Sequence, residues 1–496
     1  MKFLINSDLF EYDVRGLLQA FYPWTRFSTD SEEEDPQCLS VFYSASGMPE
    51  GIPEEERRAF LKARAERAEV AFSDGEKHFR KEIPLDLGDR KRAKTALKQA
   101  VYAILSENAG HALPWGTLTG IRPTKIAMDG LLRGASEAEI LRHMEEDLLV
   151  SVEKAELALD IARRERPILS VSEEEGYSLY IGIPFCPTTC LYCSFASSPI
   201  GEKASLVQPY LEALQEEILF TAEVFQDLPL HSVYFGGGTP TSLSSEDLEM
   251  LLKLVEKHFD LRNVREWTVE AGRPDSLSEE KLRMMLRHPV TRISVNPQTM
   301  QQKTLDLIGR RHTVEDTVEK FLLARSLGYD NINMDLILGL PGETEEDIRD
   351  TLLRTAALSP DSVTVHSLAI KRSSRLNLEK EMYAAYRMEN TDGMMDFARK
   401  TLGAEGLLPY YLYRQKNMAG NQENVGYARP GKEGVYNVLI MEESESIVAC
   451  GAGASSKHVD RATGLITRVR NPHDVATYVA DPEEMKMRKR RLFSGT

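Results

Sequence analysis

The chain has 496 residues, enough for about three domains of ordinary size, which excludes a small disulfide-stapled or disordered protein. Its 61 Lys and Arg residues against 77 Asp and Glu residues give a formal net charge of −16, which would repel a phosphate backbone. No stretch approaches the roughly 18 apolar residues of a membrane span, and the first residues become polar before a signal core could form. We therefore expect a soluble, cytoplasmic protein that neither binds nucleic acid nor spans a membrane.

Residues 1–170 have a mixed character. Charge-rich patterns at residues 91–107 and 136–166 predict helices, and an apolar stretch opens the chain. Between the helical patterns, residues 114–125 are dense in Gly and Pro, which is typical of a shaped loop. We expect an accessory α+β domain over residues 1–170.

From about residue 177, short apolar strands alternate with amphipathic helices. Strands are predicted at residues 179–183, 232–235, 267–271, 292–295, 332–338 and 362–366. Helices are predicted at residues 207–225, 245–259, 279–287, 314–327 and 345–356. Two of the helices open with the spacing of a cap, Ser244 with Asp247 and Thr344 with Asp347. Repeated strand–helix units predict parallel strands with right-handed crossovers, and hence an open or closed α/β barrel.

Beyond about residue 371 the pattern is less regular. The segment is rich in Tyr, Asn and Gly, and it ends in a basic run at residues 486–491. We interpret this run as a solvated helix end rather than a nucleic-acid patch.

The chain holds five cysteines, and three of them, Cys186, Cys190 and Cys193, fall within eight residues after a predicted strand. A secreted disulfide framework would spread its cysteines along the chain. Thiolates are the ligands of iron–sulfur clusters, and three ligands for four irons leave one iron open to a substrate or cofactor. A structural zinc site would need a fourth Cys or His nearby, and the loop has none. The pattern favours a cluster, with Cys38 and Cys450 as ordinary thiols.

A glycine run follows the next predicted strand. Residues 236–241 read Gly-Gly-Gly-Thr-Pro-Thr, which removes side chains at the carboxyl end of a strand–helix unit, so that backbone can approach a ligand. A tight turn would also explain glycines here. The combination with the cysteine loop is the more specific signal.

These motifs resemble the radical S-adenosylmethionine (SAM) superfamily and, within it, the oxygen-independent coproporphyrinogen III oxidase family. The shared motifs are Tyr-x-x-Ile-Pro-Phe-Cys at residues 180–186, the glycine run, and Asn-Met-Asp-Leu-Ile-Leu-Gly-Leu-Pro-Gly-Glu-Thr at residues 333–344. Residues 115–125 and 411–421 resemble the HemZ-type branch, called coproporphyrinogen dehydrogenase.

The resemblance implies a partial (βα)6 TIM-like barrel over residues 171–375, with the accessory domain before it and an α/β extension at residues 376–496 that covers the substrate. It implies a [4Fe-4S] cluster on Cys186, Cys190 and Cys193, whose open iron binds the amino and carboxylate groups of SAM. An electron from a low-potential donor cleaves SAM to methionine and a 5′-deoxyadenosyl radical, which removes a hydrogen from a propionate of coproporphyrinogen III. Loss of CO2 and a second electron leaves a vinyl group, and two rounds give protoporphyrinogen IX for haem. The cluster and SAM carry this chemistry, so the resemblance assigns no catalytic side chain.

The resemblance also assigns ten residues to the SAM site: Tyr180, Tyr192, Gly237, Gly238, Thr239, Glu270, Gln298, Arg310, Asp335 and Ile337. The two tyrosines would line the cluster and the methionine, although Tyr192 could simply pack. The glycines and Thr239 would meet the SAM amino group, Glu270 and Gln298 would contact the nucleoside and methionine, and Ile337 would pack on adenine.

Two of these assignments have a physical argument of their own. The guanidinium of Arg310 suits the planar SAM carboxylate, with Arg311 beside it as a surface charge. Asp335 would accept from the ribose hydroxyls. A carboxylate in an apolar strand would be costly if it faced the core without a partner, which favours the functional interpretation.

The tetrapyrrole has four carboxylates, so its site needs Lys and Arg beside flat apolar surface. The candidates are Lys371, Arg372, Arg375, Arg414 and Lys416. The two segments that carry them, residues 371–375 and 410–416, could equally be an ordinary surface strand or helix face.

Two positions depart from the family pattern. Gly182 and Phe195 stand where the best-known members carry a histidine and a fourth cysteine, and phenylalanine is also the residue of the related haem chaperones. The alternative function is therefore a haem chaperone, or another tetrapyrrole-acting radical SAM protein without coproporphyrinogen oxidase activity.

Overall fold

The structure is a computed structural model that describes residues 1–493 except 24, 31–34, 121, 416, 417, 419 and 421. Its contacts divide the chain into two compact units, Met1–Leu159 with Arg414–Asn417, and Asp160–Tyr413 with Met418–Thr496. Each unit has its own hydrophobic core. The three-domain division at residues 170 and 375 stays a prediction.

The first unit contains a four-stranded sheet in the order β1-β2-β3-β4. Strands β1 and β2 are parallel and the other pairs are antiparallel. The strands are β1 (Lys2–Ile5), β2 (Cys38–Ser44), β3 (Arg67–Ser73) and β4 (His78–Pro84). The helices are α1 (Glu11–Phe21), α2 (Glu54–Arg64), α3 (Arg90–Ala109), α4 (Thr124–Leu132) and α5 (Glu137–Arg142). Alternate residues of β2 and β3 are buried against apolar faces of α1 and α3, which confirms an α+β fold.

The helix predicted at residues 136–166 is wrong as one element. Helix α5 ends at Arg142 and continues as a π-helix at His143–Asp147, and α6 (Val152–Leu169) begins after a break in which Leu149 has φ 56°. The break receives the Gly- and Pro-rich loop, since the Thr117 N–H donates to the Leu148 carbonyl over 2.8 Å. A Cβ on Gly116 would lie 2.2 Å from the Leu148 and Leu149 carbonyl oxygens, so only glycine allows this approach.

The second unit contains an eleven-stranded sheet in the order β13-β14-β12-β11-β10-β9-β8-β5-β15-β16-β17. The seven strands from β12 to β15 in this order are parallel, and the antiparallel strands lie at its two ends. The six strands predicted from sequence are β5 (Tyr177–Ile183), β8 (Leu230–Gly237), β9 (Glu266–Glu270), β10 (Arg292–Ser294), β11 (Ile332–Leu338) and β12 (Ser362–Ser367). The partial (βα)6 barrel is therefore confirmed.

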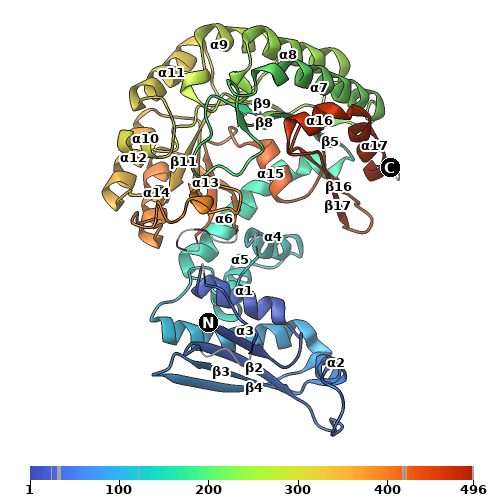
Figure 1. Ribbon diagram of the computed structural model, residues 1–496, viewed down its shortest axis with the longest axis vertical. Helices are drawn as coiled ribbons and strands as arrows, with labels where there is room; N and C mark the ends of the chain where they lie inside the picture. The colour runs from blue at the N-terminus through green and yellow to red at the C-terminus, as the bar shows by residue number, and fades with distance from the viewer. Residues whose placement is uncertain are drawn as a thin grey trace. The chain divides into compact units, whose positions relative to one another are not determined.

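Helices cover the outer side of this curved sheet (Figure 1). They are α7 (Ala204–Val224), α8 (Ser245–His258), α9 (Glu279–Met285), α10 (Gln302–Leu307), α11 (Val314–Leu327) and α12 (Glu345–Ala357). The two predicted caps form, because Ser244 accepts from the Asp247 N–H and Thr344 forms a reciprocal pair with Asp347. Every helix in the described residues is too short or too polar to span a membrane.

The C-terminal part adds strands to both ends of the barrel sheet. The remaining elements are β6 (Phe185–Cys186), β7 (Ser198–Pro199), α13 (Arg375–Leu378), α14 (Asp392–Ala404), β13 (Leu408–Tyr413), β14 (Asn424–Ala428), α15 (Val435–Met441), β15 (Ser446–Cys450), β16 (Ser455–Val459), β17 (Ile466–Arg470), α16 (Val475–Ala480) and α17 (Pro482–Phe493). Strand β15 pairs in parallel with β5 and so becomes a seventh parallel strand that the sequence did not predict.

The basic run at residues 486–491 lies in α17 and is not wholly solvated. Lys489 is 1% exposed and pairs with Glu217 of α7, which is equally buried. The prediction of a solvated helix end is wrong at this residue, because α17 packs one of its faces against α7.

Candidate functional site

The three clustered cysteines lie in the loop after β5, at the carboxyl end of the parallel strands. Cys186 and Cys190 are buried, Cys193 is half-buried, and all are free thiols. Burial raises the pKa of Cys186 to about 11, although a hydrogen bond with Thr239 lowers it, and the charges of Cys190 and Cys193 contribute to the rise. Burial also raises the pKa of Cys193. The thiols of Cys186 and Cys193 would therefore have to be ionised by the group that they bind.

This donor set fits a cluster better than one ion. In the described part of the chain, no group of three or more His, Cys, Asp and Glu side chains is placed to hold a single metal ion. A four-iron cluster offers each thiolate a separate iron, so its ligands need not meet at one point. Soft sulfur ligands are what such a cluster requires.

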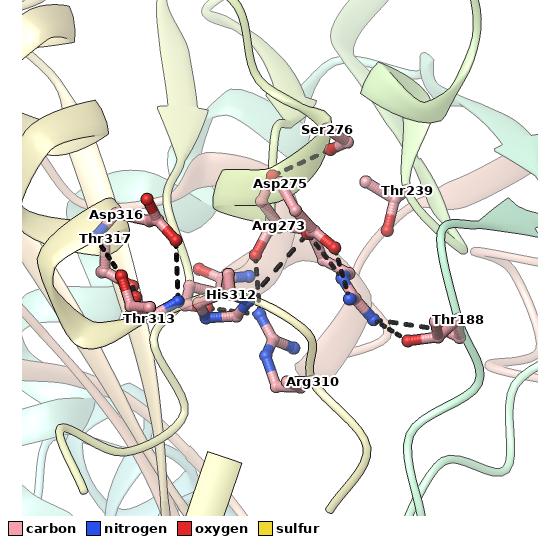
Figure 2. Close-up of polar contacts among 12 residues, drawn as sticks. Thr188, Thr239, Arg273, Asp275, Ser276, Arg310, His312, Thr313, Asp316 and Thr317 are labelled. Atoms are coloured by element: carbon pink, nitrogen blue, oxygen red, sulfur yellow. Dashed lines mark hydrogen bonds and ion pairs between the residues drawn. The ribbon is translucent and has the colours of Figure 1, made fainter. Parts of the chain in front are cut away.

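Two guanidinium groups face the Cys190 sulfur, and both are labelled in Figure 2. Arg273 follows β9 and Arg310 follows α10, and each places its Nη1 3.9 Å from Cys190 Sγ. Both side chains are buried. Hydrogen bonds to the sulfurs of a cluster, and positive charges beside them, set its reduction potential.

Arg273 is fixed by a two-point contact with Asp275 (Figure 2). Its Nε and Nη2 donate to the two Asp275 carboxylate oxygens over 2.9 and 2.6 Å. Burial alone would raise the pKa of Asp275, but the hydrogen bond and charge of Arg273 outweigh burial and the pKa is lowered. Arg273 Nη1 also donates to the hydroxyl of Thr188 over 2.8 Å, so the end of β9 is tied to the cysteine loop.

His312 completes this group from the segment before α11. Its ring is buried, with Nδ1 3.9 Å from Asp275 Oδ1, and neither ring nitrogen has a hydrogen-bond partner among the described residues. Burial, aided by the charge of Arg310, lowers the pKa of His312 to about 4. The ring is therefore neutral at pH 7 and adds no third positive charge.

The predicted glycine contacts lie where β8 meets the cysteine loop. The N–H groups of Gly238 and Thr239 donate to the carbonyls of Ile183 and Phe185 over 2.7 and 2.8 Å. A Cβ on Gly238 would lie 2.6 Å from the Phe185 oxygen, so a side chain here would displace the loop. The glycine run therefore seats the loop that carries the cysteines, a role that the sequence did not indicate. Thr239 places its hydroxyl 3.4 Å from Cys186 Sγ.

Glu270 and Tyr180 lie among stacked tyrosines inside the barrel. Tyr180, Tyr234 and Tyr436 stack on one another, with ring centroids 4.4 Å apart for Tyr234 and Tyr436. The Tyr234 hydroxyl donates to Glu270. Burial raises the pKa of Glu270 to about 7, and the charge of Asp335 adds to the rise. Tyr436 comes from α15, far along the chain, and no local pattern marked it.

The predicted contacts on β11 face the same region. Gln298 has φ 67°, and its backbone pairs with β11 by accepting from the Ile337 N–H and donating to the Asp335 carbonyl, both over 2.9 Å. The Asp335 carboxylate accepts from Asn333 Nδ2 over 2.7 Å and lies 4.0 Å from His366 Nε2. The charge of Asp335 also contributes to the raised pKa of Glu270.

The side chain of Arg310 is buried rather than exposed at the surface. Its Nη2 donates to the backbone carbonyls of Asn296 and Gly272 over 2.6 and 3.1 Å. Its Nε has no partner in the described residues. An unpaired buried N–H is costly, and a carboxylate bound beside it would remove that cost. Tyr192 is half-buried and packs against the barrel core. The assignments of Arg310 and Tyr192 to the SAM site stay predictions.

The predicted substrate contacts separate into two places. Lys371, Arg372 and Arg375 lie in and after the turn before α13, which meets the cysteine loop where the Leu376 N–H donates to the Leu191 carbonyl over 2.9 Å.

Arg414 belongs to the first unit, where it is buried and donates to the Leu118 carbonyl over 2.7 Å. Its guanidinium therefore binds a backbone carbonyl of the protein. Lys416 lies outside the described residues. The roles of these side chains toward a substrate stay predictions.

Besides the stacked tyrosines Tyr234 and Tyr436, sequence reasoning missed Arg273, Asp275 and His312. A usable signal existed for two of them, because Arg273 and Asp275 directly follow a predicted strand, and residues at the carboxyl ends of barrel strands carry function. His312 gave no such signal, because its position depends on how α10 and α11 meet.

Comparison with known proteins agrees with this geometry. Residues 180–354 match the model of the radical SAM superfamily. The chain is 43% identical over 395 residues to the oxygen-independent coproporphyrinogen-III oxidase-like protein HemZ of Bacillus subtilis, covering 78% of each chain. The chain belongs to the HemZ family of radical SAM proteins. It is accordingly an oxidoreductase-type enzyme related to coproporphyrinogen oxidases, and the cofactors of its superfamily are a [4Fe-4S] cluster and SAM.

Two further similarities place the HemZ family among its neighbours. The heme chaperone HemW of Bacillus subtilis is 32% identical over 280 residues, which cover 56% of this chain and 70% of HemW. The crystal structure of coproporphyrinogen III oxidase HemN from Escherichia coli aligns with a TM-score of 0.50 at 23% identity, over 65% of this chain and 73% of that chain. This second likeness supports the barrel fold.

Proposed function

We propose that this protein is an oxygen-independent coproporphyrinogen III oxidase, or dehydrogenase, that converts two propionates to vinyl groups and yields protoporphyrinogen IX for haem. The observation that carries the proposal is the match to HemZ, which extends over 78% of both chains and so well beyond the barrel. The barrel end also supplies soft sulfur ligands and buried polar groups without partners, as a bound cofactor would need.

Cys186, Cys190 and Cys193 would hold the cluster, and the end of β8, Glu270, Arg310 and Asp335 would hold SAM. When bound, these cofactors supply the radical that takes one hydrogen atom from the propionate, after which CO2 leaves and one electron passes to an acceptor. Arg310 would pair with the SAM carboxylate through its unpaired Nε. Asp335 would accept from the ribose. The stacked tyrosines lie beside Glu270, and Tyr436 among them is buried.

A second candidate function is that of a haem chaperone. It is favoured by the HemW relatives and by Phe195, two residues after Cys193, which is 74% exposed. An exposed aromatic ring beside the cysteine loop would suit the flat face of a tetrapyrrole that is bound without conversion.

The two functions separate in an anaerobic assay. The protein with reconstituted cluster receives SAM, a reductant and coproporphyrinogen III. The proposed oxidase forms 5′-deoxyadenosine and vinyl products together. Deoxyadenosine without vinyl products would indicate another substrate, and stable haem binding without turnover would support the chaperone.

The Asp335→Asn variant should lower SAM affinity while it keeps the iron content.

A further inference from the structure

A cavity of about 580 Å³ opens beside the cysteine loop. Its wall includes Pro187, Thr188 and Thr189, the three residues that join Cys186 to Cys190. None of the ten predicted SAM contacts lines it. The cavity therefore reaches the ligand loop from a side that the SAM site does not use.

Hydrogen bonds hold residues 187–189 of the wall in place. Thr188 donates to the Gly309 carbonyl over 2.8 Å and accepts from Arg273 over the same distance. Gly309 lines the cavity as well. A molecule in the cavity would thus be separated from two of the sulfur ligands only by one short, fixed segment. Because electron transfer slows steeply with distance, this is a favourable place for an electron to enter.

Two of the three charged residues that line the cavity are arginines. Arg311 and Arg375 both line it and both are exposed, with Glu202 as the acidic residue of the wall. Arg375 is held by Glu379 over 3.1 Å, whereas Arg311 makes no ion pair within the part of the chain that the structure describes. Arg372, also exposed, lies in the turn that leads to Arg375. On a chain of net charge −16, a positive rim at the cysteine loop selects where an acidic partner can approach.

We propose that this cavity, with Arg311 and Arg375 in its wall and Arg372 in the adjoining turn, docks an acidic electron-carrier protein, which reduces the cluster through residues 187–189. The inference rests on the proposed function only in requiring the cluster. The carrier loses one electron and the cluster gains one, with no bond made or broken. Electron-transfer encounters use small interfaces, in keeping with a single cavity and a short rim.

The test compares two reductants by stopped-flow absorbance of the reconstituted protein. One is an acidic low-potential ferredoxin reduced beforehand, and the other is photoreduced deazaflavin, which is too small to need a docking surface. The variant Arg311→Glu should slow reduction by ferredoxin by about tenfold at low ionic strength, and the difference should vanish at high salt. Reduction by deazaflavin should keep its wild-type rate and amplitude, which also shows that the variant folds and holds its cluster.

Two further variants act as controls. Arg311→Lys keeps the charge and should retain most of the ferredoxin rate. Lys257→Glu makes the same charge change at an exposed position in the last turn of α8, near the opposite ends of the strands, and should leave the rate unchanged. A wild-type ferredoxin rate in Arg311→Glu at low salt would overturn the proposal. If the same variant also bound coproporphyrinogen more weakly, the cavity would be a substrate site instead. Absence of iron in the wild-type protein would refute the proposed function and this inference together, whereas an intact cluster that yields no vinyl products would refute the proposed function alone.

Discussion

Two buried charged clusters in the barrel unit differ in how fully they are paired. Around Glu217, both carboxylate oxygens are partnered, by Lys489, by Asn471 over 2.9 Å, by the Tyr478 hydroxyl over 2.5 Å and by the Gly451 N–H over 2.7 Å. Around Cys190, the Nε of Arg310 and both nitrogens of His312 lack partners among the described residues.

Burial alone does not distinguish a structural cluster from a functional one. A complete set of partners stabilises a fold, because each buried polar atom is satisfied within the chain. Unpaired atoms beside three free thiols indicate that a further group belongs there. The comparison predicts that damage to the Glu217 cluster lowers stability, whereas damage to the Cys190 cluster changes the bound cofactors.

The largest expected effect is on the cluster itself. Replacing Cys186, Cys190 or Cys193 with Ala should abolish the brown absorbance and the bound iron, because three ligands are the minimum that leaves one iron open. Cys450→Ala and Cys38→Ala serve as controls and should keep both signals. Intact absorbance in all three variants of the loop would contradict the ligand assignment.

Substitutions in the Glu217 cluster should lower the stability of the fold. Glu217→Gln or Lys489→Met leaves an uncompensated buried charge and should lower the free energy of unfolding by about 3–5 kcal/mol in urea titrations. The double variant should recover part of this loss. Lys486→Met on the same helix removes a more exposed pair with Glu216 and should cost less than about 1 kcal/mol. A cost below that level for both single variants would refute the structural role.

Glu270 should make stability depend on pH. Its folded pKa of about 7 lies above its ordinary value of 4.5, so the folded protein holds a proton that the unfolded chain releases between these values. The stability that this proton provides is complete below pH 4.5 and is lost as pH rises through 7. Relative to Glu270→Gln, the wild type should therefore lose about 2–3 kcal/mol between pH 4.5 and pH 8 in the cofactor-free protein. A difference between the two proteins that does not change with pH would contradict this.

The smallest expected effect concerns Arg273. Arg273→Met removes one positive charge and one hydrogen bond from Cys190 and should make the midpoint potential of the cluster more negative by roughly 60 mV, the one-electron equivalent of about 1.4 kcal/mol. Arg273→Lys should restore part of the shift. Potentiometric titration monitored by electron paramagnetic resonance (EPR) measures both. An unchanged potential in Arg273→Met would show that Arg273 acts only in folding.

The sequence predicts repeating local structure well and long-range assembly poorly. The six barrel strands, the caps at Ser244 and Thr344, and the cysteine loop are all encoded by neighbouring residues. Strand β15, the burial of Lys489 and the insertion of Tyr436 each depend on contacts between segments more than 200 residues apart, as the 272-residue separation of Glu217 and Lys489 illustrates. Gly238 approaches the backbone of the cysteine loop closely, and its contact with SAM stays a prediction.

The most direct test of the central claim, that the carboxyl end of this barrel is a radical SAM site, is the EPR spectrum of the reduced protein with and without SAM. A cluster held by three cysteines has an open iron, so SAM should change the shape of the signal, and Arg310→Met should require more SAM for the same change. Identical spectra at saturating SAM would mean that no iron is open, and would contradict the account.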